Sequence, residues 1–177
     1  MSPEEAHFST LPGVAEGVRD FYERYPYPRP IDSLDNYRRL WQDAQRRRAD
    51  YHLFWPGRSY REDHAILIAG CGTSQAAKHA LSWPAPRVAG IDFSVTSVRC
   101  TEELKRKYIL NNLQIHQLPI ERVSELETSF DQIVCTGVLH HLADPDAGLR
   151  ALRGALKPDG AVHIQSRNCS ISSRGED

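Results

Sequence analysis

The apolar residues near the start of the chain recur at helical spacing. Between Pro12 and Tyr25, the residues Val14, Val18 and Phe21 follow one another at steps of four and three and share one helical face. Three closely spaced prolines come next, and a proline donates no backbone hydrogen bond and disfavours helix in the residue before it. We therefore expect a helix over residues 12–25, followed by an extended linker.

A second helical pattern begins after Ser33, whose hydroxyl is suited to capping a first turn. This helix is expected to end before the turn at Pro56 and Gly57. The arginines at 46–48 fall in its later turns, where we interpret them as a solvated face rather than an anion site. The residues that share its apolar face are Leu34, Tyr37, Trp41 and Ala44.

After residue 63, short apolar runs alternate with segments long enough to form helices. This alternation is typical of βαβ units and a parallel sheet. Each run has four to six residues and suits a strand that is buried on both faces. They predict five strands, over residues 65–69, 87–91, 113–117, 132–135 and 161–164.

Two of the predicted helices between these strands begin at recognisable caps. Ser94 is placed to cap the first, and Asp144 followed by Pro145 is a typical start for the second. The segment KPDG is expected to turn the chain into the fifth strand. The residues expected to face the sheet are Val98, Thr101, Leu104 and Tyr108 in the first helix, and Leu149, Leu152 and Leu156 in the second.

The charge balance argues against a partner that is held by electrostatics alone. The chain has 22 Lys and Arg against 23 Asp and Glu, so no overall field selects nucleic acid or an anionic membrane. The sequence has no leader-like start and no run of about 18 apolar residues. Its 4 cysteines are widely spaced, without a C-x-x-C pair, and we interpret them as reduced thiols. We expect a cytoplasmic protein with no nucleic-acid, membrane or metal partner.

The segment ILIAGCGTS joins a predicted strand to a glycine-rich turn and the start of a helix. Gly70 and Gly72 let the backbone approach a ligand closely, and the first N–H groups of the next helix carry its positive dipole end. A dinucleotide-binding turn has a third glycine where this chain has Gln75. An NAD-binding oxidoreductase is therefore kept only as a distant alternative.

Asp92 ends the second predicted strand, about twenty residues beyond the glycine turn. At this spacing an acidic side chain accepts hydrogen bonds from ribose hydroxyls. Ser94 can cap the following helix, which leaves the Asp92 carboxylate available, and Phe93 offers an apolar surface to an adenine. The pattern predicts a nucleoside-containing ligand across the ends of the first two strands.

Four segments occur in an order that is typical of a known family: GCGTS, GIDFS, FDQIVCTGVLHHLADP and LKPDG. This series resembles that of class I S-adenosylmethionine-dependent methyltransferases of the type 11/12-like group, over roughly residues 65–166. The resemblance implies a Rossmann-like, doubly wound α/β fold with a mainly parallel sheet of strand order 3-2-1-4-5, and S-adenosyl-L-methionine as cofactor. It also implies the cofactor-binding residues, which are Gly70, Cys71 and Gly72 at the methionine, Asp92 at the ribose, Phe93, Leu118, Pro119 and Ile120 at the adenine, and Thr136 and Gly137 beneath the sulfonium.

Three positions depart from the family's pattern. Ile68 stands where an acidic residue is usual, Ser74 replaces a third glycine, and Pro119 occupies the place of an acidic residue that contacts the adenine amine. We expect Gln75, His116 or Gln117 to compensate for the missing polar contacts. The departures motivate an alternative to methyl transfer, namely a catalytically impaired domain that binds S-adenosylmethionine or serves as a scaffold.

The methyl acceptor is expected to be a small molecule. The chain lacks the [DNS]-P-P-[YF] sequence with which relatives hold planar amines of nucleobases or glutamine. His140 and His141 follow the fourth strand, and His140 is the candidate catalytic base, unless the pair only orients its loop. Selection of the acceptor is assigned to the N-terminal cap, with Tyr25, Tyr27 and Trp41 as wall residues, although Trp41 also suits simple packing.

The end of the chain predicts a C-terminally truncated sheet. The family's sheet normally continues beyond the fifth strand as a hairpin, but the polar tail after Ser166 has Ile171 as its only large apolar residue. We therefore expect a missing final hairpin, a frayed tail and an exposed edge at residues 161–164 through which copies self-associate. The expected organisation is a helical cap at 1–62, a methyltransferase core at 63–166 and a polar tail at 167–177.

Overall fold

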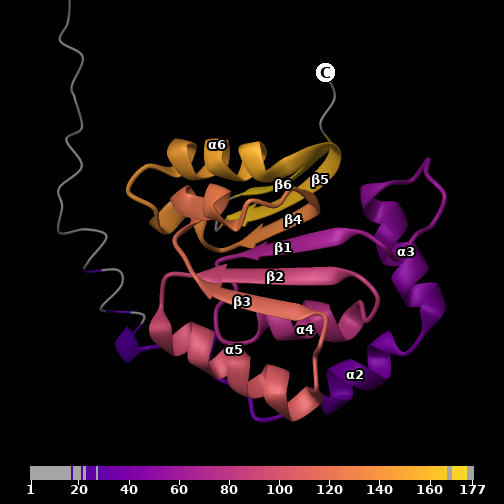
Figure 1. The fold of residues 1–177 in the computed structure, drawn as a ribbon, viewed down its shortest axis with the longest axis horizontal. Helices are drawn as coiled ribbons and strands as arrows, with labels where there is room; N and C mark the ends of the chain where they lie inside the picture. Colours follow the sequence, from indigo (N-terminus) through magenta and orange to yellow (C-terminus); the bar gives the residue numbers. More distant parts are fainter. Residues whose placement is uncertain (1–16, 18–20, 22, 27, 167–168, 175–177) are drawn as a thin grey trace, which may run out of the picture.

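The computed structural model describes residues 17, 21, 23–26, 28–166 and 169–174, which build an α/β fold on one sheet (Figure 1). The strand order is β3-β2-β1-β4-β5-β6. The strands are β1 (Ala65–Ala69), β2 (Arg87–Asp92), β3 (Leu113–Gln117), β4 (Phe130–Thr136), β5 (Leu156–Ser166) and β6 (Cys169–Arg174). The helices are α2 (Asp35–Trp41), α3 (Ala44–Phe54), α4 (Gln75–Ser82), α5 (Val95–Tyr108) and α6 (Pro145–Ala155), with 3-10 helices η1 (Ile120–Leu126) and η2 (Leu139–His141).

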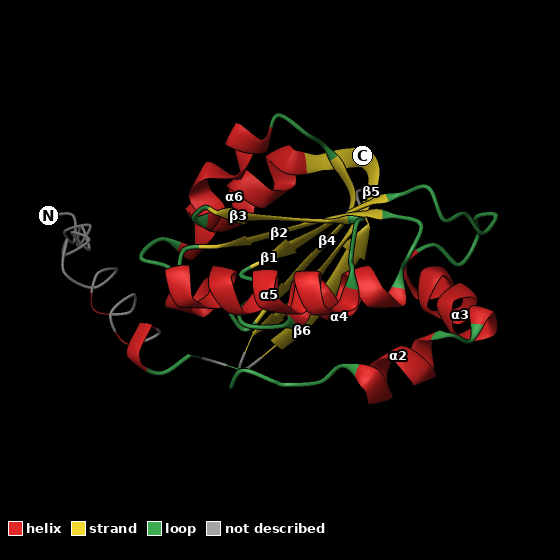
Figure 2. Ribbon diagram, turned by 60° about the horizontal axis from the view of Figure 1, so that its bottom comes forward, coloured by secondary structure: helices red, strands yellow, loops and turns green. Residues whose placement is uncertain are grey.

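Helices cover the sheet on both sides. Helices α4 and α5 lie on one face and α6 lies on the other, while α2 and α3 flank the region where β1 begins (Figures 1 and 2). The first five strands pair in parallel, and this confirms the predicted strand order 3-2-1-4-5. A parallel sheet with helices on both faces is the doubly wound arrangement that the alternating sequence pattern predicted.

Strand β1 shows how one apolar run supplies two cores. Every residue of the strand is buried, and alternate side chains point to opposite faces. Ile66 and Ile68 join the core under α4 and α5 together with Leu104, whereas Leu67 joins the core under α6 together with Leu152. The sheet is therefore buried on both sides at β1.

Gly90 on β2 allows α4 to lie unusually close to the sheet. A Cβ atom at this position would be 2.7 Å from the Cβ of Ala76 and 3.3 Å from the Sγ of Cys71. Such distances leave no room for a methyl group in a close-packed interior. The turn that begins α4 is therefore pressed against β2.

The predicted element bounds are confirmed for β1 and β3, and the predicted caps are confirmed for two helices. The Ser94 hydroxyl accepts the Ser97 N–H at 3.1 Å at the start of α5. The Asp144 carboxylate accepts the Ala147 N–H at 2.9 Å, with Pro145 as the first residue of α6. Both caps satisfy N–H groups that have no partner within the helix.

The single helix expected after Ser33 is wrong, because the chain forms α2 and α3 there. The Asp43 carboxylate accepts the Gln45 N–H at 2.8 Å and starts α3 as a new helix. The guanidinium of Arg47 donates to the carbonyl of Trp41 at 2.6 Å. It thereby provides a hydrogen-bond donor for the backbone carbonyl of the last residue of α2. The earlier helix, predicted over residues 12–25, lies largely outside the described residues, as do Val14, Val18 and Tyr27, although residues 17, 21, 23 and 24 are helical.

Two expectations, one for α6 and one for β5, are wrong in detail. Leu149 is 42% exposed, because α6 turns Gly148, Leu152 and Ala155 toward the sheet instead. The segment KPDG does not precede β5 but lies within it, where the pairing with β4 shifts register between Phe130 and Gln132. In α5, Thr101, Leu104 and Tyr108 are buried as expected, while Val98 is only partly buried.

The expected exposed edge at residues 161–164 is wrong, since β6 pairs along it. Strand β6 runs antiparallel to β5, from Cys169 opposite Ser166 to Arg174 opposite Ala161. Pairing of this kind uses backbone N–H and C=O groups, so the polar composition of the segment does not prevent it. The tail is therefore not frayed over residues 169–174, whereas residues 167–168 and 175–177 lie outside the described part of the chain.

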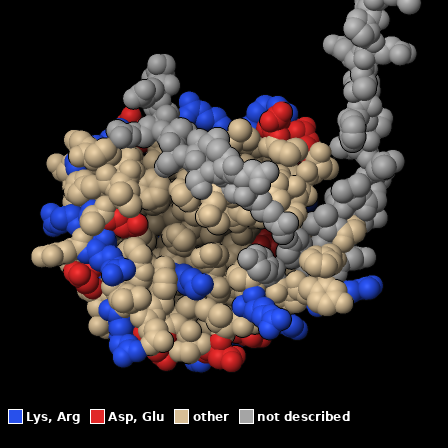
Figure 3. Space-filling view, turned by 180° about the vertical axis from the view of Figure 1, so that it is seen from behind, with Lys and Arg blue, Asp and Glu red and all other residues tan. Residues whose placement is uncertain are grey.

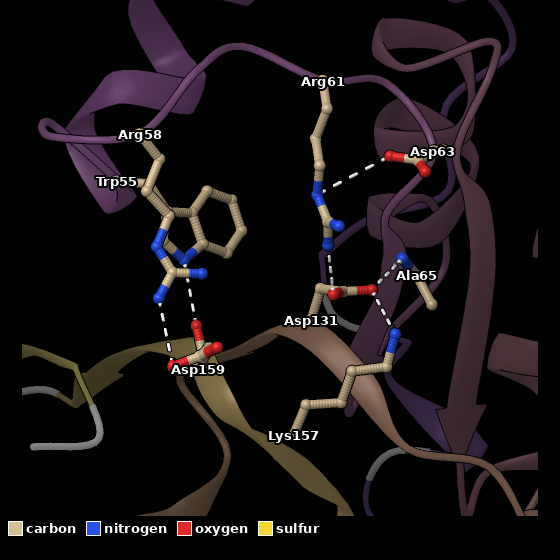
Figure 4. A network of polar contacts seen from close by, with 8 residues as sticks. All are labelled: Trp55, Arg58, Arg61, Asp63, Ala65, Asp131, Lys157 and Asp159. Carbon is tan, nitrogen blue, oxygen red and sulfur yellow. Dashed lines mark hydrogen bonds and ion pairs between the residues drawn. The ribbon is translucent and has the colours of Figure 1, made fainter.

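A polar network fastens the connection before β1 to the amino ends of β4 and β5 (Figure 4). The Asp131 carboxylate accepts the Ala65 N–H at 2.8 Å and pairs with Lys157 at 2.8 Å and with Arg61. These partners hold the pKa of Asp131 below its usual range, although burial alone would raise it. Beside this network, the pair of Arg58 with Asp159 is exposed to solvent.

His64, directly before β1, is buried among aromatic rings. Its ring meets those of Tyr51, Trp55 and Trp83 edge-on, with centroid distances from 5.1 Å to 5.9 Å. Among the described residues, neither ring nitrogen has a hydrogen-bond partner. Burial lowers the pKa of His64 to about 4, against the opposing influence of the Asp131 carboxylate. The structure thus holds this histidine in its neutral form.

Candidate functional site

The glycine turn and the predicted aspartate meet at the carboxyl ends of β1 and β2. The N–H groups of Gly70 and Cys71 both donate to the carbonyl of Ile91 at 2.9 Å, and the Gly72 N–H donates to the Asp92 carboxylate at 2.8 Å. Gly70 and Gly72 have φ values of 69° and 54°, in the left-handed region that favours glycine. Gly70 and Asp92 therefore lie on the same side of the molecule.

The Asp92 carboxylate is almost fully buried, with 6% of the residue exposed. It accepts N–H groups from Gly72 at 2.8 Å and from Ser94 at 2.9 Å. An ionised carboxylate has about four acceptor positions, so further donors can still be accommodated. Burial raises the pKa of Asp92, the backbone donors oppose this shift, and the nearby Glu23 carboxylate adds to it. The Asp92 carboxylate is therefore buried and can still accept hydrogen bonds from a ligand.

A cavity of about 460 Å³ opens beside this carboxylate, and we call it the Asp92 cavity. Its volume lies within the range of roughly 300 to 1,000 Å³ that is usual for small-molecule sites. Most of its wall is apolar, which suits a flat ring system. Its lining residues are Gly70, Asp92, Phe93, Gln117, Leu118, Pro119, Ile120, Glu121, Arg122, Val138, His141, Leu142 and Ala143.

A second cavity, of about 590 Å³, lies between helices α3 and α4 and strands β1, β4 and β5, and we call it the His79 cavity. It shares Gly70 with the Asp92 cavity, so the glycine turn separates the two. Its lining residues are Asp50, Leu53, Phe54, Ile68, Gly70, Gln75, His79, Gln132, Val134, Thr136, His163 and Gln165.

The structure brings most of the predicted cofactor residues to one of these cavities. Those that line the Asp92 cavity are Gly70, Asp92, Phe93, Leu118, Pro119 and Ile120. Gln75 and Thr136 line the His79 cavity instead. The predicted site is thus divided along the carboxyl edge: Asp92 and the apolar residues line one cavity, and Gln75 and Thr136 line the other.

Other predicted residues line neither cavity. The side chain of Cys71 belongs to the core, with 0% of the residue exposed, and its thiol has a raised pKa because of burial. Gly72 and Gly137 contribute backbone, and the Gly137 N–H donates to the Gln165 carbonyl at 2.6 Å. His140 is exposed, whereas its neighbour His141, with a ring centroid 4.0 Å away, lines the Asp92 cavity.

Several cavity residues were not singled out from the sequence. Glu121 lies two positions after Pro119, so an acidic group does follow β3, but shifted into η1. Val138 lies against the glycine turn, and a Cβ atom at Gly70 would be 2.3 Å from a Val138 methyl carbon. Glu121 could have been predicted as a site residue, because it follows the end of the third strand closely in the sequence. The position of Val138 could not, because it depends on the turn after β4.

The described part of the N-terminal segment reaches the same edge of the sheet. The Glu23 carboxylate accepts the Val95 N–H at 2.7 Å and the Thr96 N–H at 3.2 Å at the start of α5. These hydrogen bonds hold the pKa of Glu23 below its usual value, although desolvation opposes them. The Thr73 hydroxyl donates to the Pro28 carbonyl at 2.7 Å. Glu23 and Pro28 are therefore attached near the start of α5 and near the glycine turn.

Of the predicted wall residues of the cap, the described Tyr25 and Trp41 line neither cavity. Tyr25 is 64% exposed, and Tyr27 lies outside the described residues. Trp41 packs against Trp83, with a ring centroid distance of 6.5 Å. The structure therefore gives Trp41 the packing role that its sequence pattern also allowed. In the part of the chain that the structure describes, no helix is both long and apolar enough to cross a bilayer.

Comparison with known proteins finds relatives that are longer than this chain. An uncharacterized protein of Synechococcus sp. is 34% identical over 167 residues, covering 89% of this chain and 38% of its own length. A tRNA U34 carboxymethyltransferase of Campylobacter curvus is 30% identical over 71% of this chain and 39% of its own length. A ubiquinone biosynthesis O-methyltransferase of Neisseria meningitidis is 32% identical over 58% of this chain and 44% of its own length. The chain therefore spans less than half the length of these relatives.

Solved structures share the fold. The crystal structure of coclaurine N-methyltransferase bound to N-methylheliamine and SAH has a TM-score of 0.54 and 21% identity, covering 66% of this chain and 34% of that one. A family model described as "Methyltransferase domain" matches residues 67–162, which is more than half of the chain. The match contains the glycine turn, Asp92 and β4. The chain therefore belongs to the methyltransferase domain family, as a class I member with S-adenosylmethionine as the cofactor.

Proposed function

We propose that the chain binds S-adenosylmethionine in the Asp92 cavity and transfers its methyl group to a small-molecule acceptor. The single observation that supports this most is the buried Asp92 carboxylate, which is held at the glycine turn and lines a cavity with apolar walls. In this proposal the carboxylate accepts hydrogen bonds from the ribose hydroxyls. Phe93, Leu118, Pro119 and Ile120 contact the two faces and the edge of the adenine.

The polar atoms of the adenine need partners, and two residues of the cavity can supply them. Gln117 ends β3, and its amide donates weakly to the Phe93 carbonyl at 3.5 Å, so the amide oxygen can accept from the adenine amine. Glu121, in the first turn of η1, lies on the same wall. These residues take the place of the acidic residue that Pro119 replaces.

The methionine part of the cofactor is proposed to lie at Gly70, Cys71 and Gly72, with Thr136 and Gly137 beneath the sulfonium. The sulfonium supplies an activated methyl group, and the residues of the chain have to align it with the acceptor and exclude water. Because Gly70 borders both cavities, a methyl group there faces the His79 cavity. The cofactor and the acceptor would then occupy opposite sides of the glycine turn.

A base after β4 is also part of the proposal, for acceptors that have to lose a proton. His140 is exposed and His141 lines the Asp92 cavity, so substitution of each to Ala separates the two. We expect the variant at the true base to lose about 100-fold or more in methyl transfer. Equal activity of both variants and the parent chain would refute a base at this pair.

The names of relatives point to more than one kind of transfer, methyl transfer to an oxygen in ubiquinone biosynthesis and carboxymethyl transfer to U34 of a tRNA. The absence of nucleic-acid partners therefore stays a prediction for this chain. The division into a cap at 1–62, a core at 63–166 and a tail at 167–177 is likewise proposed, and the acceptor is selected where cap and core meet.

Titration calorimetry with S-adenosylhomocysteine tests the cofactor site. We expect Asp92→Asn to weaken binding about 10- to 100-fold, because hydrogen bonds to a charged group contribute roughly 1.5 to 3 kcal/mol. The matched control is Asp146→Asn on the exposed start of α6, which should leave the affinity unchanged. Thermal unfolding of each variant shows whether it is folded. No heat with the folded parent chain at millimolar ligand, or an unaltered affinity of Asp92→Asn, would refute the proposal.

A further inference from the structure

The His79 cavity has one wall from the sheet and one from two helices. Its sheet wall carries Gln132, Val134 and Thr136 from β4 and His163 and Gln165 from β5, on alternate positions of each strand. Helices α3 and α4 form the opposite wall. Seen from behind the view of Figure 1, the molecule is hollowed near its centre, and the surface inside the hollow is largely drawn in tan (Figure 3). The lining of the His79 cavity combines polar and apolar side chains, with Asp50 as its acidic residue.

His79 presents a hydrogen-bond acceptor to this cavity. Its Nδ1 lies 3.0 Å from the backbone carbonyl of Gln75, one turn earlier in α4. A carbonyl oxygen can only accept, so Nδ1 carries the proton and donates it. Burial lowers the pKa of His79, which keeps the ring neutral. In this tautomer Nε2 has a lone pair and no proton, and it can only accept.

Asp50 on α3 adds a second acceptor to the lining of the same cavity. Its carboxylate is partly buried, which raises its pKa, while the nearby His163 opposes this shift. The His163 ring is held edge-on against Phe54, with a centroid distance of 6.3 Å. The apolar residues Phe54 and Leu53 of α3 lie on the same wall as Asp50. A ligand here meets two acceptors beside an apolar surface.

The described residues that line the cavity include no Lys and no Arg. An anionic ligand would therefore find the Asp50 carboxylate and no compensating cation, and desolvating an unpaired charge is costly. A ligand that donates hydrogen bonds from hydroxyl groups satisfies the lone pairs of His79 and Asp50 without bringing a charge. Its apolar body would cover Phe54 and Val134.

We propose that the His79 cavity binds the methyl acceptor, and that the acceptor is an uncharged small molecule with hydroxyl groups on an apolar body, held by hydrogen bonds to His79 and Asp50. This inference rests on the proposed function, because it is the shared Gly70 and the neighbouring Thr136 that bring the cavity to the methyl group. His79 and Asp50 are then the residues that determine specificity. Neither residue belongs to the predicted cofactor site.

The experiment uses three benzene derivatives with the same 1,3-substitution as probes: resorcinol with two hydroxyls, isophthalate with two carboxylates, and 1,3-bis(aminomethyl)benzene with two ammonium groups. Ligand-detected NMR measures the binding of each to the full chain, with and without saturating S-adenosylhomocysteine. Resorcinol has eight non-hydrogen atoms, and a molecule of this size binds with a Kd of about 1 to 10 mM in a well-formed site. We expect resorcinol to bind with this affinity both with and without S-adenosylhomocysteine, and the dicarboxylate and diammonium probes to bind more weakly.

Variants locate the site. His79→Phe removes the acceptor at similar size and should weaken resorcinol about 10-fold, whereas the matched change His116→Phe on β3, which lines neither cavity, should not. If His79→Phe does not fold, Asp50→Asn replaces it, with an expected loss of several-fold. The inference is overturned if resorcinol does not bind, if either charged probe binds more tightly, if S-adenosylhomocysteine displaces resorcinol, or if folded variants bind it unchanged. Failure of S-adenosylhomocysteine to bind, with resorcinol bound at His79, would refute the proposed function instead.

Discussion

Replacing His64 by Phe tests how the aromatic surroundings of this residue act on stability. The folded protein lowers the pKa of His64 from 6.5 to about 4. Between these two values the unfolded chain binds a proton that the folded chain rejects, so the parent protein loses stability as the pH falls from about 6.5 to 4. One pKa unit corresponds to about 1.4 kcal/mol, and the total loss is therefore roughly 3 kcal/mol. His64→Phe cannot take up this proton and should lack this part of the pH dependence.

Urea denaturation at a series of pH values measures the effect. We compare the free energy of unfolding of His64→Phe with that of the parent chain, because all other titrating groups are shared and largely cancel in the difference. From neutral pH to about pH 4, the free energy of unfolding of the parent should fall by roughly 3 kcal/mol more than that of the variant. The control Leu149→Phe changes an exposed side chain that does not titrate and should run parallel to the parent. Parallel curves for His64→Phe as well would refute the reasoning.

Two further substitutions test the packing and the polar network by denaturation. Asp131→Ala should cost about 2 to 3 kcal/mol, because it leaves the Ala65 N–H without its acceptor, whereas Asp159→Ala in the exposed pair should cost less than about 0.5 kcal/mol. Since the pKa of Asp131 is lowered in the folded protein, the part of this cost that comes from its charge should persist down to about pH 4 and decline as the pH falls further, through the lowered pKa; a cost that does not change with pH there would contradict the assignment. Gly90→Ala should lower the free energy of unfolding by about 1 to 3 kcal/mol, because its methyl group overlaps α4. Gly154→Ala, in open space on α6, should leave stability unchanged or raise it. Similar melting temperatures for the two variants would refute the close approach of α4 to Gly90.

The sequence predicts the central strands well because their signal is local. In β1 the bounds agree with the apolar run, since burial on both faces requires consecutive apolar residues. The bounds of β3 were also predicted, although its apolar Leu113 and Ile115 alternate with polar residues. The caps at Ser94 and Asp144 were also predictable, because a side chain that bonds an N–H two or three residues ahead depends on local sequence alone. The strand order does not follow from these local signals; the resemblance to class I methyltransferases implied it, and the structure confirms it.

The misses arise where distant parts of the chain decide. No proline or glycine marks the break between α2 and α3, which depends on Asp43 and on the long reach of Arg47. Strand β6 forms on backbone pairing with β5, and a side-chain pattern does not reveal it. The separation of Gln75 and Thr136 from the Asp92 cavity could not be predicted either, because it depends on which face of the sheet α3 and α4 cover.

The sheet combines strand pairs of very different separation along the chain. Cys169 pairs with Ser166, whereas Gln132 pairs with Ile66. Closing a long stretch of chain costs more entropy than closing a short one, so local pairs form faster than distant ones. In refolding, we therefore expect amide protons of the β5–β6 hairpin to find their partners without waiting for the middle of the sheet. The pairing of β1 with β4, on which both cavities depend, then becomes the slow step in acquiring ligand affinity.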